Sequence, residues 1–341
     1  MQMHHMKSLA PLRLGQCALS CLLSSASCLL SPHMIPYLIR RLWQSVIVVF
    51  GVVTVVFFVL QLTGDPVRIM LGETASEEDI QNTKRQLGLD RPIPEQYVVF
   101  LSKAVRGDFG ESIRQRGQPA MDIVLSRYPA TLKLAFLALA VSVTLATILG
   151  VISAVKRYTI IDNLVMFLAL IGQSVPNFWL GIMLILIVAV QFGWLPSQGY
   201  GDGGIRYLIL PMLTLAAPGL ARLTRLVRSG MLDIMGHDYV RTARAKGLRE
   251  ARVIFGHALK NAAIPLVTVI GLDMGALLGG AVVTEQIFSW PGVGLEVIIA
   301  INGRDFPVVQ AAVFVVAVSF VLINLLVDLA YTWLDPRVRL N

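Results

Sequence analysis

Cysteine and histidine are scarce in this chain, and both are missing where chemistry in a membrane would need them. All three cysteines, Cys17, Cys21 and Cys28, lie in the first 33 of 341 residues. The rest of the chain can therefore form neither a disulfide nor a thiolate metal site. None of the five histidines lies in a long apolar run, which argues against a membrane-embedded serine–histidine enzyme. We expect no catalytic residue and no metal site.

Nucleotide- and metal-binding motifs are also missing. The sequence contains neither G-x-x-x-x-G-K-[ST] nor H-E-x-x-H, so it lacks a phosphate-binding loop and a helical zinc motif. His237 and His257 lie twenty residues apart in a polar loop, a spacing that does not indicate a metal site. We therefore expect no cofactor in this chain.

Charge is sparse as well. Only 15% of the residues are charged, 55% are hydrophobic and the mean hydropathy is +0.70, which is typical of a multi-pass membrane protein. The net charge of +8 comes from basic residues that mostly flank apolar runs. This is the distribution that membrane topology produces, so we expect contact with membrane lipid and none with nucleic acid.

Long apolar runs divide the chain into membrane spans. About 20 apolar residues cross the roughly 30 Å hydrocarbon core of a bilayer. The sequence predicts an all-α protein with six such spans, at residues 43–62, 134–155, 164–192, 207–227, 262–283 and 308–331. The fourth is the weakest, because Pro211 and Pro218 interrupt a short clean run before Arg222. Neighbouring helices can satisfy the backbone groups that a proline frees, so we keep it.

Arginine and lysine predict the orientation of the spans, because short basic loops stay in the cytoplasm. The loop at about 222–261 is strongly basic, with nine Lys or Arg against three acids in 222–260, whereas 193–206 and 284–307 hold one arginine each. We expect both termini in the cytoplasm, including the tail 335–341. The first span lies within 34–63, and the transmembrane core comprises 134–334.

Two segments lie outside the spans. Residues 64–133 are expected to form a folded extracytoplasmic segment, with one helix starting after Ser76 and stopping at Gly88, and another starting at Pro94. Residues 1–33 precede Met34, which opens the basic-flanked start "MIPYLIRRLWQ". We expect this extension to be dispensable, although it has some features of a signal peptide.

A basic, helix-prone stretch, "DYVRTARAKGLREARVIFGHALKNAAIPLV", occupies residues 238–267. Its pattern predicts a helix, a turn at Gly247, a second amphipathic helix and entry into the membrane at Pro265. Anchoring of span ends to anionic lipid, at about 1 kcal/mol per basic residue, would account for the charge. It would not account for the position of Gly247.

This stretch resembles the cytoplasmic E-A-A-x-x-x-G signature of the inner-membrane permeases of ATP-binding-cassette (ABC) importers. Arg241, Thr242, Ala243 and Gly247 occupy the first part of the signature, with Arg241 and Thr242 replacing its glutamate and first alanine. "YVRTARAKGL", "GDFGES", "RYPATLKLA" and "FSWPGVGLEVIIAINGRDFPVVQA" are similar to the dipeptide and oligopeptide subgroup of these permeases, which also transports nickel complexes and glutathione. The resemblance extends from Met34 to the C-terminus.

The resemblance implies the type I permease fold and a subunit of a larger importer in the inner membrane of a bacterium or archaeon. Its partners would be a second permease, two ATPase subunits that hold ATP–Mg, and an extracytoplasmic solute-binding protein. Ala243, Ala245 and Leu248 would fill a groove on an ATPase, and Arg241, Arg244 and Lys246 would orient docking. The expected ATPase-docking residues are Asp238, Tyr239, Arg241, Thr242, Ala243, Arg244, Ala245, Lys246, Gly247 and Leu248.

Two acids are candidates for the translocation path. Asp273 lies within the fifth span, where a carboxylate either lines a water-filled path or makes a hydrogen bond between helices. Glu285 begins the outer loop that leads to Pro291 and Gly292, near the expected mouth of the path. An ion-coupled secondary transporter that uses Asp273 is the alternative function. Inverted halves would favour it, and the hydropathy pattern shows none.

Overall fold

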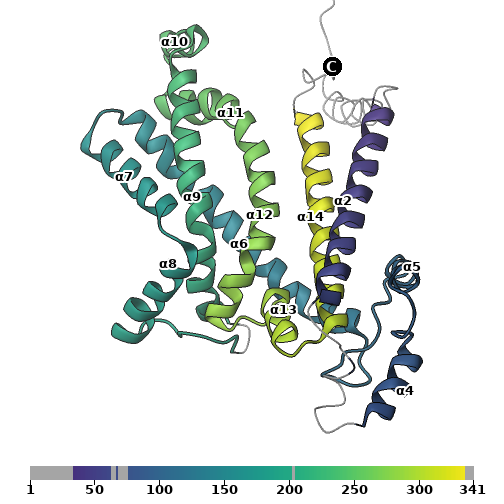
Figure 1. Ribbon diagram of the computed structural model, residues 1–341. Coiled ribbons are helices and arrows are strands. Elements are labelled where there is room, and N and C mark those ends of the chain that lie inside the picture. The colour runs from purple at the N-terminus through teal and green to yellow at the C-terminus, as the bar shows by residue number, and fades with distance from the viewer. Residues whose placement is uncertain (1–33, 63–66, 68–75, 202–203, 335–341) are drawn as a thin grey trace, which may run out of the picture.

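The computed structural model describes residues 34–62, 67, 76–201 and 204–334, and within them the fold is a bundle of helices (Figure 1). Among the described residues the only β-type pairing is an isolated bridge between Glu111 and Pro119. The elements are α2 (Met34–Leu62), α4 (Glu77–Leu87), α5 (Ile93–Ala104), α6 (Ala120–Val155), α7 (Ile160–Ser174), α8 (Asn177–Leu184), η1 (Ile185–Gln191, π-helical), α9 (Ile205–Met235), α10 (Asp238–Ala245), η2 (Arg252–Ala258, π-helical), α11 (Leu259–Ala262), α12 (Ile264–Phe288), α13 (Val293–Asn302) and α14 (Phe306–Leu334).

Five of the expected spans are single helices, namely α2, α6, α9, α12 and α14, each long and apolar enough to cross a membrane. The weak fourth span is confirmed, because α9 continues through both Pro211 and Pro218. α6 begins at Ala120, well before the expected start at 134, and includes Pro129. The long apolar runs therefore located these helices, while the ends of several helices extend beyond the runs.

The expected third span, 164–192, is wrong as a single helix. It consists of α7 and the α8–η1 pair, bent by 107° at the break between Ser174 and Asn177. The break coincides with Pro176, which has no backbone N–H and disfavours the helical conformation at the preceding residue. Val175 is accordingly extended, with φ −79° and ψ 125°. This stretch is a broken span or a re-entrant hairpin.

Small residues let the helices of the bundle approach closely. A side chain at Gly150 of α6 would lie 2.7 Å from Val227 Cβ of α9, and one at Gly271 of α12 would lie 2.2 Å from Val327 of α14. Such contacts are typical of packed membrane helices, where dispersion replaces the hydrophobic effect. α2 contacts α14, and the ion pair between Arg41 and Asp328 at 3.2 Å links these two helices.

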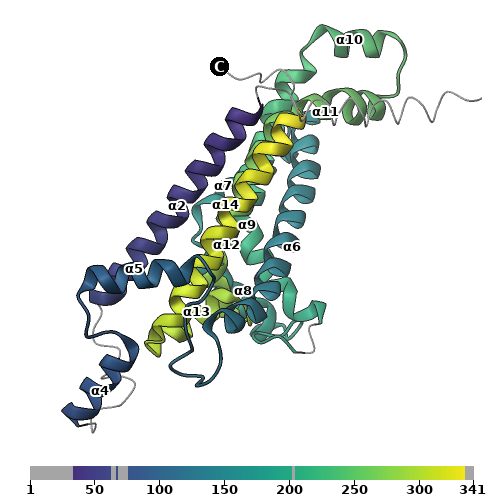
Figure 2. The ribbon, with the colours of Figure 1, turned by 90° about the vertical axis from the view of Figure 1, so that its right-hand side faces the viewer.

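The bundle has two distinct ends. α10 lies at one end, together with the start of α2 and the end of α14, whereas α4, α5 and α13 lie at the opposite end (Figures 1 and 2). Both helices expected between 64 and 133 are confirmed. Ser76 caps α4 by accepting a hydrogen bond from the Asp79 N–H, and Gly88 ends it in the left-handed conformation. The extension 1–33 and the tail 335–341 lie outside the described residues.

The orientation of this bundle can be tested by labelling. We expect a cysteine at Ser102 in α5 to react with an impermeant thiol reagent from outside, and one at Ser229 in α9 to be protected. Both side chains are exposed, and α5 lies at the end of the bundle opposite the C-terminal end of α9. The background is a variant with Ser in place of the three native cysteines. Labelling of the Ser229 position and not the Ser102 position would invert the topology.

Candidate functional site

Residues 238–262, which we call the hook, project beyond the membrane helices at one end of the bundle (Figure 2). α10 ends at Ala245 with Lys246 as its C-cap, and Gly247 follows with φ +72°, a left-handed conformation that glycine adopts without strain. The Gly247 N–H donates to the Arg244 carbonyl at 2.9 Å and closes the last turn of α10. The predicted helix, glycine turn and second helix are therefore confirmed, with η2 and α11 as the second helical stretch.

The hook has a small apolar core of its own. Val240 and Val253 are fully buried and Ala243 is 7% exposed, with Leu248 and Ile234 packed around them. Ala243 thus faces the core of the hook and packs against residues of its own chain. Its expected insertion into a groove on a partner stays a prediction. The sequence pattern missed the packing of Ala243 within the hook because a helix of eight residues presents few positions, and only the tertiary contact with η2 decides which face is covered.

The outer surface of the hook is polar and basic. Exposed side chains there include Asp238, Tyr239, Arg241, Thr242, Arg244, Ala245 and Lys246. The Arg244 Nη2 lies 2.6 Å from Glu250 Oε1, and this hydrogen bond lowers the pKa of the Glu250 carboxyl. Asn261 Nδ2 donates to the Tyr239 hydroxyl at 2.9 Å and ties α10 to α11. These contacts hold the surface in one shape.

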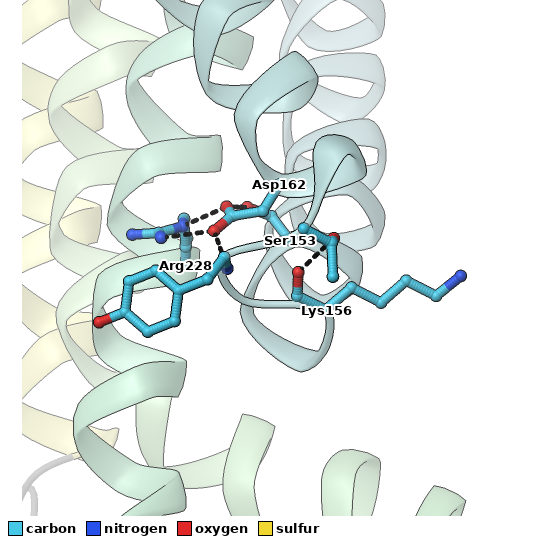
Figure 3. Close-up of polar contacts among 6 residues, drawn as sticks. Ser153, Lys156, Asp162 and Arg228 are labelled. Carbon is cyan, nitrogen blue, oxygen red and sulfur yellow. Dashed lines mark hydrogen bonds and ion pairs between the residues drawn. The ribbon is translucent and has the colours of Figure 1, made fainter.

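A buried ion pair fixes the turn between α6 and α7 against α9 (Figure 3). Arg228 of α9 donates to Asp162 of α7 through Nε to Oδ1 at 2.7 Å and through Nη2 to Oδ2 at 2.8 Å. Asp162 also accepts from the Ser153 hydroxyl and from the Tyr158 N–H. The Asp162 carboxylate thus accepts four hydrogen bonds, two of them from one guanidinium, and is fully satisfied, which indicates a structural lock. Sequence reasoning missed this cluster, although an acid in an apolar run was a signal for it.

Glu285 is at the centre of a second buried cluster. Its Oε1 accepts from the Thr131 hydroxyl of α6 at 2.7 Å, and its Oε2 accepts from the Leu295 N–H in the first turn of α13 at 3.1 Å. The Val293 N–H donates to Thr131 Oγ1 at 2.8 Å. Glu285 is fully buried within the chain, and its assignment to the translocation path stays a prediction. It joins α12, α6 and the start of α13, where a helix N-terminus favours an anion.

Gly292 provides a test of this cluster. A Cβ at Gly292 would lie 2.1 Å from Glu285 Oε1, so Gly292→Ala should displace the carboxylate and lower the free energy of unfolding by about 1–3 kcal/mol. Gly204→Ala is the matched control, because no atom lies within 4 Å of a Cβ built there. The measurement is the thermal unfolding midpoint of the purified protein in detergent. Equal midpoints for the two variants would contradict the tight packing at Glu285.

Asp305 forms a third cluster, which the sequence analysis did not identify. It accepts from the Ser112 hydroxyl and from the backbone N–H groups of Ile113 and Arg114, at 3.1 Å and 3.2 Å for the two backbone contacts. Asp305 precedes α14, so these bonds attach the loop 110–119 to the end of the bundle opposite the hook. Nothing in the spacing of the sequence predicts a contact between residues almost two hundred positions apart.

Asp273 contacts Arg222, and this pair differs from the others. Arg222 Nη2 of α9 donates to Asp273 Oδ1 of α12. Within the described part of the chain, Asp273 Oδ2 is buried without a hydrogen-bond partner. The Asp273 side chain is 6% exposed, whereas that of Arg222 is 51% exposed. Asp273 therefore makes a hydrogen bond between helices, which is one of the two roles expected for it. Its partner, Arg222, is the half-exposed member of the pair.

The bundle, its buried charge clusters and the hook define a multi-pass helical membrane protein. Two family models match it: "Binding-protein-dependent transport system inner membrane component" over residues 146–340, and the N-terminal part of such components over residues 34–135. The chain belongs to this family of transport-system membrane subunits.

Similar proteins support the same assignment. The chain is 40% identical over 337 residues to the dipeptide transport system permease protein DppB of Escherichia coli (strain K12), covering 90% of this chain and 99% of the relative. It is 38% identical over 315 residues to the oligopeptide transport system permease protein AppB of Bacillus subtilis (strain 168), covering 90% and 100%. It is 42% identical over 307 residues to the glutathione transport system permease protein GsiC of Escherichia coli O1:K1 / APEC, covering 90% and 99%.

A solved structure has the same fold. The methionine ABC transporter MetNI, in an inward-facing conformation, matches with a TM-score of 0.53 at 19% identity over 63% of this chain and 97% of that chain. At this identity the likeness concerns the fold alone. It agrees with the all-helical permease architecture that the resemblance implied.

Proposed function

We propose that this chain is the membrane permease subunit of an ABC importer that translocates peptides or related small solutes. The family assignment supports a transport role, and the relatives named above are permeases of dipeptide, oligopeptide and glutathione transport systems. These substrates share a short peptide backbone with a free carboxylate. Residues of the chain itself bind and release the solute, and we assign no catalytic step to them.

The observation that carries the proposal is the hook. A helix held outside the bundle by its own core, an ion pair and the Tyr239–Asn261 hydrogen bond presents a basic surface of fixed shape. A rigid projection attached to α9 and α12 transmits movement of a docked partner to both spans. We infer that the exposed face of α10 docks on an ATPase subunit, with Arg241, Arg244 and Lys246 as orienting charges.

The complete importer would contain this chain, a second homologous permease, two ATPase subunits and an extracytoplasmic binding protein. ATP–Mg would bind to the ATPase subunits. The hook end of the bundle, with the start of α2 and the end of α14, would face the cytoplasm, and α4, α5 and α13 would face the other side. Lipid would cover the outer faces of the spans in the inner membrane of the cell.

The ion-coupled alternative is not favoured, because the family is one of binding-protein-dependent systems. In addition, Asp273 has Arg222 as its partner and thus already contacts a fixed cation.

The test is co-purification followed by transport. We expect the tagged chain, expressed with the genes of its neighbours, to retain ATPase subunits through affinity purification. Reconstituted with the binding protein, the complex should take up labelled di- or tripeptides only when ATP is supplied on the hook side. Uptake driven by a proton or sodium gradient without ATP would contradict the proposal and support the secondary transporter.

A further inference from the structure

Three arginines recur at intervals of three along the second half of α9, and each contacts a different side chain on another helix. Arg222 contacts Asp273 of α12, Arg225 Nη1 donates to Gln173 Oε1 of α7 at 2.6 Å, and Arg228 contacts Asp162 of α7. Over six residues of helix the row is about 9 Å long. The three arginines differ in how many hydrogen bonds they make to these partners.

The carboxylate partner of Arg228 is fully satisfied, whereas that of Arg222 is not. The Arg228 guanidinium makes two bonds to Asp162 and its side chain is 23% exposed. Arg222 makes a single bond to Asp273 through Nη2, and its side chain is 51% exposed, so N–H donors of its guanidinium are left over for another partner. Asp273 is likewise half satisfied, with Oδ2 buried and without a partner in the described part of the chain. The Arg222–Asp273 pair therefore leaves hydrogen-bonding groups of both side chains unused, unlike the Arg228–Asp162 pair.

The depth of Arg222 restricts what its exposed face contacts. It lies within the expected span 207–227, five residues and hence about 8 Å before the end of that span nearer the hook. Charged side chains at this depth face a water-filled cavity or a protein interior, since exposure to lipid is costly. A half-exposed guanidinium within the expected span 207–227 thus marks the polar side of α9.

We propose that Arg222 lines the translocation path and binds the carboxylate of the solute in transit, with Asp273 as the residue that positions its guanidinium. The proposal rests on the proposed function. A guanidinium binds a carboxylate through parallel N–H donors, and Arg222 has donors available for this contact after its bond to Asp273. The anion that fits is the C-terminal carboxylate of a short peptide. Because Asp273 offsets part of the positive charge, the solute is held weakly enough to leave, as translocation requires.

The first experiment compares two matched solutes in the complete reconstituted importer: a labelled dipeptide with a free carboxylate and the same dipeptide as its C-terminal amide. We expect Arg222→Gln to lower the maximal uptake rate of the free acid by about tenfold, the effect of one charge-assisted hydrogen bond, and to leave the amide unchanged. The binding protein is the same in both preparations, so a change in the acid-to-amide ratio reports on the permease. Arg206→Gln, at the other end of α9 where Arg206 contacts the Trp194 carbonyl, is the control and should leave the ratio unchanged.

The second experiment does not depend on transport of the amide. In a variant with Ser at positions 17, 21 and 28, Arg222→Cys should lose uptake of the free acid. Aminoethyl methanethiosulfonate, which attaches a positive charge at that cysteine, should restore uptake severalfold, whereas the neutral methyl and the negative sulfonatoethyl reagents should not. A lipid-facing side chain would not react with these water-soluble reagents, and that result would overturn the proposal.

A double variant distinguishes solute binding by Arg222 from a purely structural role of that residue. If Arg222 serves only to neutralise Asp273, Arg222→Gln combined with Asp273→Asn should recover uptake, because both charges are gone. We expect no recovery. Recovery, or an equal loss for acid and amide, would assign Arg222 to the bundle or to an interface with the second permease, and would leave peptide import standing. Absence of peptide uptake by the parent importer would overturn the proposed function and this inference with it.

Discussion

Replacing Ala243 with Glu should abolish retention of the ATPase subunits and with it all solute uptake, while membrane insertion stays normal. Ala243 is enclosed by Val240 and Val253, so the new carboxylate would be buried without a partner at a cost of several kcal/mol, about 3 or more. The hook would lose its core. Affinity purification measures ATPase retention, and the rate of trypsin cleavage in the hook measures its local fold.

Two further substitutions separate the shape of the hook from its docking surface. Ala245→Glu makes the same chemical change two residues away on an exposed position, so it should weaken docking while the hook stays as protease-resistant as the parent. Gly247→Val places a β-branched residue at φ +72°, a strain of about 1–3 kcal/mol, and should open the turn after α10. Arg252→Ala, on the exposed side of η2, is the control and should be mild.

The result for Ala243→Glu decides the assignment of the hook. Should this variant keep its ATPases and transport like the parent, coupling through the hook is wrong. Anchoring of basic residues to anionic lipid would then account better for residues 238–262.

The second large effect is expected at the Arg228–Asp162 lock. Asp162→Ala removes a carboxylate whose side chain is 2% exposed and leaves the guanidinium, the Ser153 hydroxyl and the Tyr158 N–H without their acceptor. Loss of one member of a buried ion pair costs about 3–5 kcal/mol. We expect a much lower thermal unfolding midpoint in detergent and a mobile turn between α6 and α7.

Asp233→Ala is the matched control for this lock. Asp233 is an exposed acid on α9 toward the same end of the bundle, and its removal should change the free energy of unfolding by no more than about 0.5 kcal/mol and leave the midpoint close to that of the parent. Asp162→Asn keeps an acceptor and should lie between the two. A midpoint for Asp162→Ala as high as that of the control would show that the pair contributes nothing to stability.

The sequence by itself determined the class of this protein and the positions of most spans. Apolar length is a local property, because each stretch of about 20 residues must match the bilayer regardless of its neighbours. The caps of α4 at Ser76 and Gly88, and the turn at Gly247, were likewise predictable, since each depends on the conformation of one or two residues. The motifs that resemble importer permeases agree with the family matches over residues 34–135 and 146–340.

Only the tertiary structure decided which polar groups meet. The break at Pro176 bends the expected third span by 107°, because proline has no backbone N–H and Val175 before it is extended. Ala243 faces inward because η2 folds back onto α10, and Glu285 is buried because α13 starts beside it. The contacts of Asp162, Asp273 and Asp305 join residues 66, 51 and up to 193 positions apart. Such pairs leave no periodic trace in the sequence, since a buried charge is defined by the donors that surround it and these come from other helices.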